Sequence, residues 1–179
     1  LAGKKVLELG AGCGAITRFL GEAGAEVTAV EGSLRRATIT AERTRDLSNV
    51  TVVCDLIDAF DAGEKYDLVV LVGVLEYSHL FIEGDRPDQL LLSRIRAMLL
   101  PGGTVVVAIE NKLGHKYWAG APEDHVGRPF VGLENAYETK GPRTYGKKEL
   151  TSLLAAAGFN SSDFLYPYPD YKLPSIILR

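Results

Sequence analysis

Three glycines at alternate positions lie between a short apolar segment and a helix-like segment near the start of the chain. The apolar segment leads into Glu8, and Gly10, Gly12 and Gly14 follow at every second position. Glycine has no Cβ atom, so its main chain can approach a bound molecule closely. The start of the next helix offers unpaired N–H groups. This arrangement predicts a strand–turn–helix unit that binds a small molecule.

A second acidic residue stands at the end of the next apolar segment. Residues 27–30 lead into Glu31, seventeen residues after Gly14. A carboxylate at the end of the second strand of a nucleotide-binding α/β protein accepts hydrogen bonds from a ribose. The two features together predict an α/β domain that binds a nucleoside cofactor, with Glu31 as the ribose acid.

The same glycines also satisfy the G-x-G-x-x-G/A pattern of dinucleotide-binding proteins. An NAD(P)-dependent Rossmann oxidoreductase is therefore the alternative interpretation. Two details favour a different cofactor. Glu8 lies two residues before the first glycine, where a dinucleotide site usually has an apolar residue, and Gly14 falls on the alternate spacing. A carboxylate repels a pyrophosphate but attracts a cationic amino-acid moiety.

Composition argues against several other classes of protein. Apolar residues make up 46% of the 179 residues and charged residues 24%, as in ordinary globular domains. The net charge of −3 and the lack of a basic block disfavour a nucleic-acid partner, and no apolar run has the length of a membrane span. Two isolated cysteines favour a reduced, cytoplasmic setting. The chain starts without Met, almost directly in a strand, so we expect flanking domains of a longer protein.

Strand-like and helix-like segments alternate along most of the chain, which implies parallel strands joined by right-handed crossovers. Strands are expected at residues 5–9, 26–30, 50–54, 67–72, 104–109, 159–166 and 175–178. Helices are expected at residues 14–23, 34–47 and 87–100, and between Gly146 and Gly158. We interpret residues 1–179 as a single domain.

Residues 111–145 interrupt this alternation. The segment is rich in Gly, Pro, His, acidic and aromatic residues and shows no periodicity. Loops of this length in small domains are usually functional or disordered, and the aromatic residues argue against disorder. We therefore expect a substrate-side insertion at about 111–145.

Several motifs in the chain resemble, in order, those of the class I S-adenosylmethionine-dependent methyltransferases. The sequence E-x-G-x-G-x-G at residues 8–14 resembles motif I of that family, and residues 66–70, 100–103 and 157–159 are similar to later motifs. The resemblance implies a three-layer Rossmann-like α/β fold. Its mostly parallel sheet would have seven strands in the order 3-2-1-4-5-7-6, with strand 7 antiparallel.

The resemblance also implies a binding site for S-adenosyl-L-methionine. The main chain at Gly10, Gly12 and Gly14 would lie against the methionine and ribose parts of the cofactor. Glu8 would orient this turn or meet the amino group, and Glu31 would accept hydrogen bonds from the ribose hydroxyls. The alternative for the glycines is an ordinary tight turn.

Three further residues complete the expected cofactor site. Asp55 follows the third strand and would accept a hydrogen bond from the adenine amino group, although it equally suits a helix cap. Leu56 would pack on the adenine ring. Val74, after the fourth strand, would line the sulfonium end, while Glu76 and Tyr77 are expected to shape the adjoining loop.

Methyl transfer from a sulfonium is an in-line displacement, so positioning supplies much of the catalysis. An oxygen or nitrogen nucleophile that loses a proton also needs a base within hydrogen-bond reach. His125, in the cluster Glu123-Asp124-His125, is our first candidate because an unperturbed histidine titrates near neutral pH. Tyr145 is a second candidate. The alternative is that this cluster orders the loop, and we expect no metal site from three adjacent residues.

The acceptor is expected to be a small molecule or a glycan. Residues 110–114 and 166–174 resemble methyltransferase domains of bacterial surface-glycan and glycosyltransferase-linked proteins. That resemblance implies O-methylation of a sugar hydroxyl or another small polar acceptor. A third interpretation is a non-catalytic nucleoside-binding domain of a larger protein.

Overall fold

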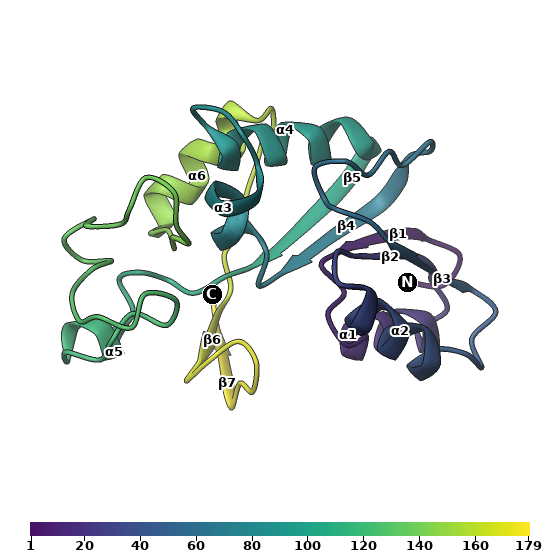
Figure 1. The fold of residues 1–179 in the computed structure, drawn as a ribbon, viewed down its shortest axis with the longest axis horizontal. Helices are drawn as coiled ribbons and strands as arrows, with labels where there is room; N and C mark the ends of the chain where they lie inside the picture. Colours follow the sequence, from purple (N-terminus) through teal and green to yellow (C-terminus); the bar gives the residue numbers. More distant parts are fainter. The chain divides into compact units, whose positions relative to one another are not determined.

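The computed structural model describes all of residues 1–179 and divides them into two units. Unit 1 consists of Leu1–Val74 and Arg94–Val107, and unit 2 consists of Leu75–Ser93 and Ala108–Arg179. Unit 1 holds the central sheet, and unit 2 holds most of the irregular segments (Figure 1).

Five strands form the sheet, in the order β3-β2-β1-β4-β5. β1 pairs in parallel with β2 on one side and with β4 on the other, and β2 pairs in parallel with β3. The strand order reverses between β1 and β4, which is where ligands of open α/β sheets bind. The strands are β1 (Lys5–Leu9), β2 (Glu26–Glu31), β3 (Val50–Cys54), β4 (Tyr66–Val72) and β5 (Leu99–Ala108).

Helices α1 (Ala15–Glu22) and α2 (Leu34–Arg43) connect the first three strands and lie together beside them (Figure 1). The core between helices and sheet is apolar because strands covered by helices carry continuous runs of apolar residues. Its buried members are Val6, Ala11, Leu20, Ala25, Val27, Ala29 and Val70. This packing fixes the carboxyl ends of β1 and β2, from which the glycine turn and Glu31 project.

The remaining elements are short, apart from α4 (Pro87–Met98) and α6 (Lys147–Ala156). Unit 2 contains η1 (Leu75–Tyr77), α3 (Ser78–Phe81), α5 (His115–Trp118) and the antiparallel pair β6 (Tyr166–Tyr168) and β7 (Ile176–Leu178). None of the helices is both long and apolar enough to cross a bilayer.

Hydrogen bonds and ion pairs order the 111–145 segment. The Lys112 ammonium group is buried and lies 2.6 Å from the Glu149 carboxylate at the start of α6. Glu149 also accepts a hydrogen bond from the Gly146 N–H, which caps the same helix. An isolated bridge joins Asn111 to Tyr145, so the two ends of the segment lie side by side.

The expected seven-stranded sheet is wrong in its strand count. The sheet has five strands, and β6 and β7 pair with each other instead. β6 begins at Tyr166, not near residue 159, because the polar residues 160–163 compete for main-chain hydrogen bonds. Prolines 167, 169 and 174 provide no N–H for a sheet ladder, which limits this region to a short hairpin.

Two other boundaries differ from the sequence expectations. β5 begins at Leu99, not at residue 104, and includes the Pro-Gly-Gly sequence that separates the expected helix from the expected strand. Gly102 has a φ of 79°, a conformation that glycine adopts without strain and that permits a bend inside the strand. Helix α2 ends at Arg43, before the expected limit near residue 47.

Candidate functional site

The three glycines after β1 all adopt left-handed conformations, but for different reasons. A Cβ on Gly10 would lie 2.5 Å from Val74 Cγ2, and one on Gly14 would lie 2.8 Å from Thr40 Cγ2. These two glycines allow the turn to pack tightly within unit 1. Around Gly12, whose φ is 58°, nothing lies within 4 Å of an ideal Cβ. Gly12 therefore presents bare main chain to open space, as a cofactor-binding turn requires.

Glu31 links this turn to the end of β2. Its side chain is only 2% exposed, and Oε2 accepts a hydrogen bond of 2.9 Å from the Gly12 N–H. Oε1 accepts hydrogen bonds from the Ser33 N–H and from the Arg36 guanidinium. A carboxylate oxygen has two lone pairs, so Oε2 has capacity for a further donor such as a ribose hydroxyl.

Glu8 is a buried acid directly before the turn. Its side chain is 3% exposed, and the Thr17 hydroxyl donates a hydrogen bond of 2.5 Å to Oε2. Burial raises the pKa of Glu8 to about 7, and the hydrogen bond from Thr17 opposes that rise only in part. The ionised form of Glu8 is therefore costly to bury, and a cationic ligand group would stabilise it.

Asp55 and Leu56 lie beside the end of β2, where Glu31 is opposite Cys54 in the sheet register. An ideal Cβ on Gly32 would be 3.4 Å from Leu56 Cδ2 and 3.7 Å from the Asp55 carbonyl oxygen. Asp55 Oδ1 accepts a hydrogen bond from the Leu56 N–H, and the Leu56 side chain is 57% exposed. Both residues therefore lie on the side of the sheet that holds Glu31 and the glycine turn.

Thr17, Arg36 and Thr40 support the site, and sequence reasoning did not identify them. Thr40 is fully buried, and its hydroxyl donates a hydrogen bond of 2.9 Å to the Gly12 carbonyl oxygen. Helical periodicity predicted the two helices that carry these residues. Polar residues in such a pattern are ordinarily expected to face solvent. Only the packing of α1 and α2 against the turn reveals their roles.

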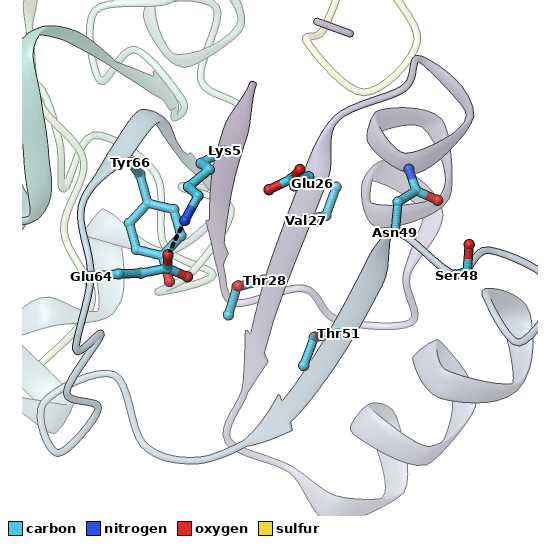
Figure 2. A pocket seen from close by; sticks show the side chains of 9 residues that line it. All are labelled: Lys5, Glu26, Val27, Thr28, Ser48, Asn49, Thr51, Glu64 and Tyr66. Atoms are coloured by element: carbon cyan, nitrogen blue, oxygen red, sulfur yellow. Dashed lines mark hydrogen bonds and ion pairs between the residues drawn. The ribbon is translucent and has the colours of Figure 1, made fainter. Parts of the chain in front are cut away.

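A separate hollow opens at the opposite edge of the sheet (Figure 2). It is lined by residues at or near the amino ends of the strands, among them Thr28, Tyr66 and the ion pair of Lys5 with Glu64, whose charged atoms are 2.5 Å apart. Ligands of parallel α/β sheets bind at the carboxyl ends. This hollow is therefore not the candidate cofactor site.

Unit 2 contains a buried cluster of acids around His125. The ring atom Nε2 lies 3.7 Å from Glu76 Oε1 and 3.8 Å from Glu110 Oε2, and Nδ1 lies 3.2 Å from Glu123 Oε1. All three acids are at most 7% exposed. The Lys172 ammonium group lies 3.3 Å from the other oxygen of Glu110. From the sequence, Glu76 was expected only to shape a loop, and Glu110 had no expected role in the site.

These acids raise the pKa of His125 to about 9. Glu76 contributes most, burial opposes the rise, and Glu123 and Glu110 add to it. The imidazole is consequently protonated at neutral pH and is a poor proton acceptor there. His125 was a candidate base because an unperturbed histidine has a near-neutral pKa. In this environment its pKa is well above neutral.

Tyr145 belongs to a second buried network in unit 2. Its hydroxyl donates a hydrogen bond of 3.3 Å to Asp88 Oδ2, and His79 Nε2 lies 3.6 Å from the same oxygen. Burial and the neighbouring Asp88 charge raise the pKa of Tyr145 well above its ordinary value. The two candidate catalytic residues thus lie in different hydrogen-bond networks.

A family model described as a methyltransferase domain matches residues 7–105. The chain is 31% identical over 115 residues to a ubiquinone biosynthesis O-methyltransferase of Bradyrhizobium diazoefficiens. This match covers 63% of the chain and 42% of that protein, so the chain spans about two fifths of such a relative. A shorter match, 52% identical over 48 residues, is to ribosomal RNA small subunit methyltransferase A of Streptococcus sanguinis and covers 27% of this chain and 17% of that protein.

Solved structures show the same architecture. The CcbJ methyltransferase of Streptomyces caelestis is 29% identical with a TM-score of 0.57, over 64% of this chain and 46% of that one. The glycopeptide N-methyltransferase MtfA, solved in complex with S-adenosylmethionine, is 26% identical with a TM-score of 0.52, over 62% and 49% of the chains. An O-methyltransferase-like protein of Nostoc punctiforme has a TM-score of 0.68 over 93% and 49% of the chains. At 22% identity it shows the fold alone.

Proposed function

Because this chain belongs to the methyltransferase domain family, we propose that it transfers a methyl group from S-adenosylmethionine to a small polar acceptor. One observation carries the proposal. Gly12 offers unobstructed main chain at the carboxyl end of β1, and its N–H is tied to the buried Glu31 carboxylate. This combination suits a nucleoside, because the main chain approaches the ligand while the adjacent acid accepts from sugar hydroxyls.

The residues of unit 1 fit each part of the cofactor. The carboxylate of Glu8 matches the ammonium group of the methionine moiety, and Glu31 matches the ribose. Leu56 offers an exposed apolar surface for the adenine ring, and Asp55 an acceptor for its amino group. Val74 packs against Gly10 and would line the sulfonium end. When bound, this cofactor supplies an activated methyl group, so the chain mainly has to orient it and exclude water.

We assign the acceptor to residues of unit 2, because the chain enters this unit directly after Val74 and Val107, just past β4 and near the end of β5. A hydroxyl acceptor gives up a proton during transfer, and buried carboxylates near His125 are proton acceptors of suitable type. In this proposal His125 and Tyr145 act through charge and position. O-methylation is supported by the similarity to ubiquinone biosynthesis O-methyltransferases, and a sugar hydroxyl of a surface glycan is the acceptor that we favour.

Calorimetry tests the cofactor assignment directly. We expect S-adenosylhomocysteine to bind with one site per chain, while NAD produces no heat of binding under the same conditions. Tight binding of NAD without a response to S-adenosylhomocysteine would overturn the proposal. Incubation with radiolabelled S-adenosylmethionine and a panel of sugars, phenols and amines then identifies the acceptor. If only the amines of the panel become labelled, the reaction is N-methylation and the proposed O-methylation is wrong.

Glu31→Gln tests the ribose acid without changing its size. We expect S-adenosylhomocysteine to bind about tenfold more weakly, a loss of about 1.4 kcal/mol, because a charge-assisted hydrogen bond becomes a neutral one. The measurement is the dissociation constant from calorimetry, with Glu42→Gln on the exposed face of α2 as the control. An affinity equal to that of the natural chain would show that Glu31 does not contact the ligand.

A further inference from the structure

Three ligand-type side chains converge in unit 2 from distant parts of the sequence. Glu76 comes from η1, Glu110 follows β5, and His125 lies in the 111–145 segment. One donor atom from each lies within 4.8 Å of the other two. The proximity of two carboxylates and an imidazole is produced by the fold, since the three residues are far apart in the chain.

Two oxygen atoms of this cluster are buried without a hydrogen-bond partner. They are Glu76 Oε2 and Glu110 Oε2, and these two residues are 1% and 7% exposed. The Lys172 ammonium group lies near the other Glu110 oxygen, Oε1, at 3.3 Å. Unsatisfied buried carboxylate oxygens are strongly unfavourable. A bound cation would remove this penalty.

Glu123 fixes the orientation of the imidazole. Its Oε2 accepts hydrogen bonds from the main-chain N–H groups of His125 and Val126, at 2.8 and 2.7 Å. Its Oε1 lies 3.2 Å from His125 Nδ1. Nδ1 is therefore paired with a carboxylate, and Nε2 is directed toward Glu76 and Glu110. Metal-binding histidines have this arrangement, in which an outer carboxylate orients the ring.

The spacing of the donors suits a metal ion. Ligand atoms about 2.1 Å from an ion lie about 3.0–3.4 Å apart at octahedral and tetrahedral angles, so donors a few tenths of an ångström farther apart need only a small inward movement. The observed separations from His125 Nε2 are 3.7 Å to Glu76 and 3.8 Å to Glu110. Three protein ligands leave further coordination positions open for water or an acceptor group.

We propose that Glu76, Glu110 and His125 bind a divalent transition-metal cation, which takes the place of the proton on His125 Nε2 and releases it to solvent. Glu123 is the positioning residue for His125. The mixed set of two carboxylates and one imidazole favours Mn²⁺ over Mg²⁺ or Ca²⁺, which take oxygen ligands. The charge of a dication also balances the two carboxylates. The proposed ligands differ from the adjacent residues 123–125, from which no metal site was expected, and share only His125 with them.

Titration of the full chain with Mn²⁺, followed by the electron paramagnetic resonance of free Mn²⁺, tests the site. We expect one Mn²⁺ per chain, and we expect Glu76→Gln and Glu110→Gln each to raise the dissociation constant at least tenfold. Glu83→Gln is the matched control, because it makes the same change in unit 2 on a side chain that is 94% exposed. This control should bind Mn²⁺ like the natural chain.

Circular dichroism and thermal unfolding establish that the variants fold, which we expect because each substitution removes one of three clustered negative charges. If Glu76→Gln and Glu110→Gln both bind Mn²⁺ as tightly as the natural chain does, the proposal is overturned. The absence of binding of Mn²⁺, Zn²⁺ and Mg²⁺ at low millimolar concentration would also overturn it and would leave His125 as a cation neutralising its acidic neighbours. The titration contains no cofactor or acceptor, so its outcome is independent of the proposed methyl transfer.

Discussion

Replacing Glu8 with glutamine is expected to flatten the dependence of folding stability on pH between about 5 and 8. Burial raises the pKa of Glu8 from 4.5 to about 7 in the folded chain. The folded state therefore retains this proton over a range in which the unfolded state has lost it. For an acid whose pKa rises on folding, the stabilising contribution is full below the unfolded pKa and is lost as pH rises through the folded value.

The expected size of the effect follows from the pKa shift. A shift from 4.5 to about 7 corresponds to about 3 kcal/mol between acid and alkaline limits. Urea unfolding at pH 5 and pH 8 measures it, as the difference between the natural chain and Glu8→Gln. That difference should move in favour of the variant by up to about 3 kcal/mol as pH rises. Glu42→Gln, an exposed site in α2, should show no such trend. Parallel stability curves for the natural chain and Glu8→Gln would contradict the assigned pKa.

The same residue is expected to link pH to cofactor binding. If the ammonium group of S-adenosylhomocysteine meets Glu8, binding favours the ionised carboxylate and should release a proton near pH 7. Calorimetry in buffers of different ionisation enthalpy measures this release, and Glu8→Gln should abolish it. A buffer-independent heat of binding in the natural chain would place the ammonium group away from Glu8.

The sheet of unit 1 was predictable because its determinants are local. β1 and β3 have the bounds expected from their apolar runs, and the expected α/β methyltransferase fold is confirmed. Buried parallel strands are short and continuously apolar, so their ends are marked by the first polar or glycine residue. The glycine turn was predictable for the same reason, since Gly10, Gly12 and Gly14 adopt backbone conformations that other residues rarely tolerate.

Unit 2 was much less predictable because long-range contacts determine it. The cluster joins Glu76, Glu110 and His125, and no local periodicity relates these positions. A pKa depends on neighbours in space, so the environment that protonates His125 had no signature in the sequence. The β6–β7 hairpin was mistaken for part of the main sheet because an apolar run does not specify its pairing partner.

Gly12→Ala is expected to separate cofactor binding from folding. Gly12 has a φ of 58°, and an added methyl group would point into space that contains no atom of the chain within 4 Å. The variant should lose about 1–2 kcal/mol of unfolding free energy, the cost of a left-handed conformation for alanine. Its affinity for S-adenosylhomocysteine should fall a further tenfold to hundredfold, because the methyl group occupies the position in which bare main chain approaches the ligand.

Gly3→Ala provides the matched control for this experiment. Gly3 also has a positive φ, 69°, and also has no atom within 4 Å of an ideal Cβ, but it precedes β1, at the opposite edge of the sheet. Both variants should therefore show similar losses in urea unfolding, and only Gly12→Ala should lose affinity in calorimetry. Equal affinities in the two variants would mean that the space above Gly12 is not where the cofactor lies. Since the glycine turn carries the proposed function, that result would move the site away from the carboxyl end of β1.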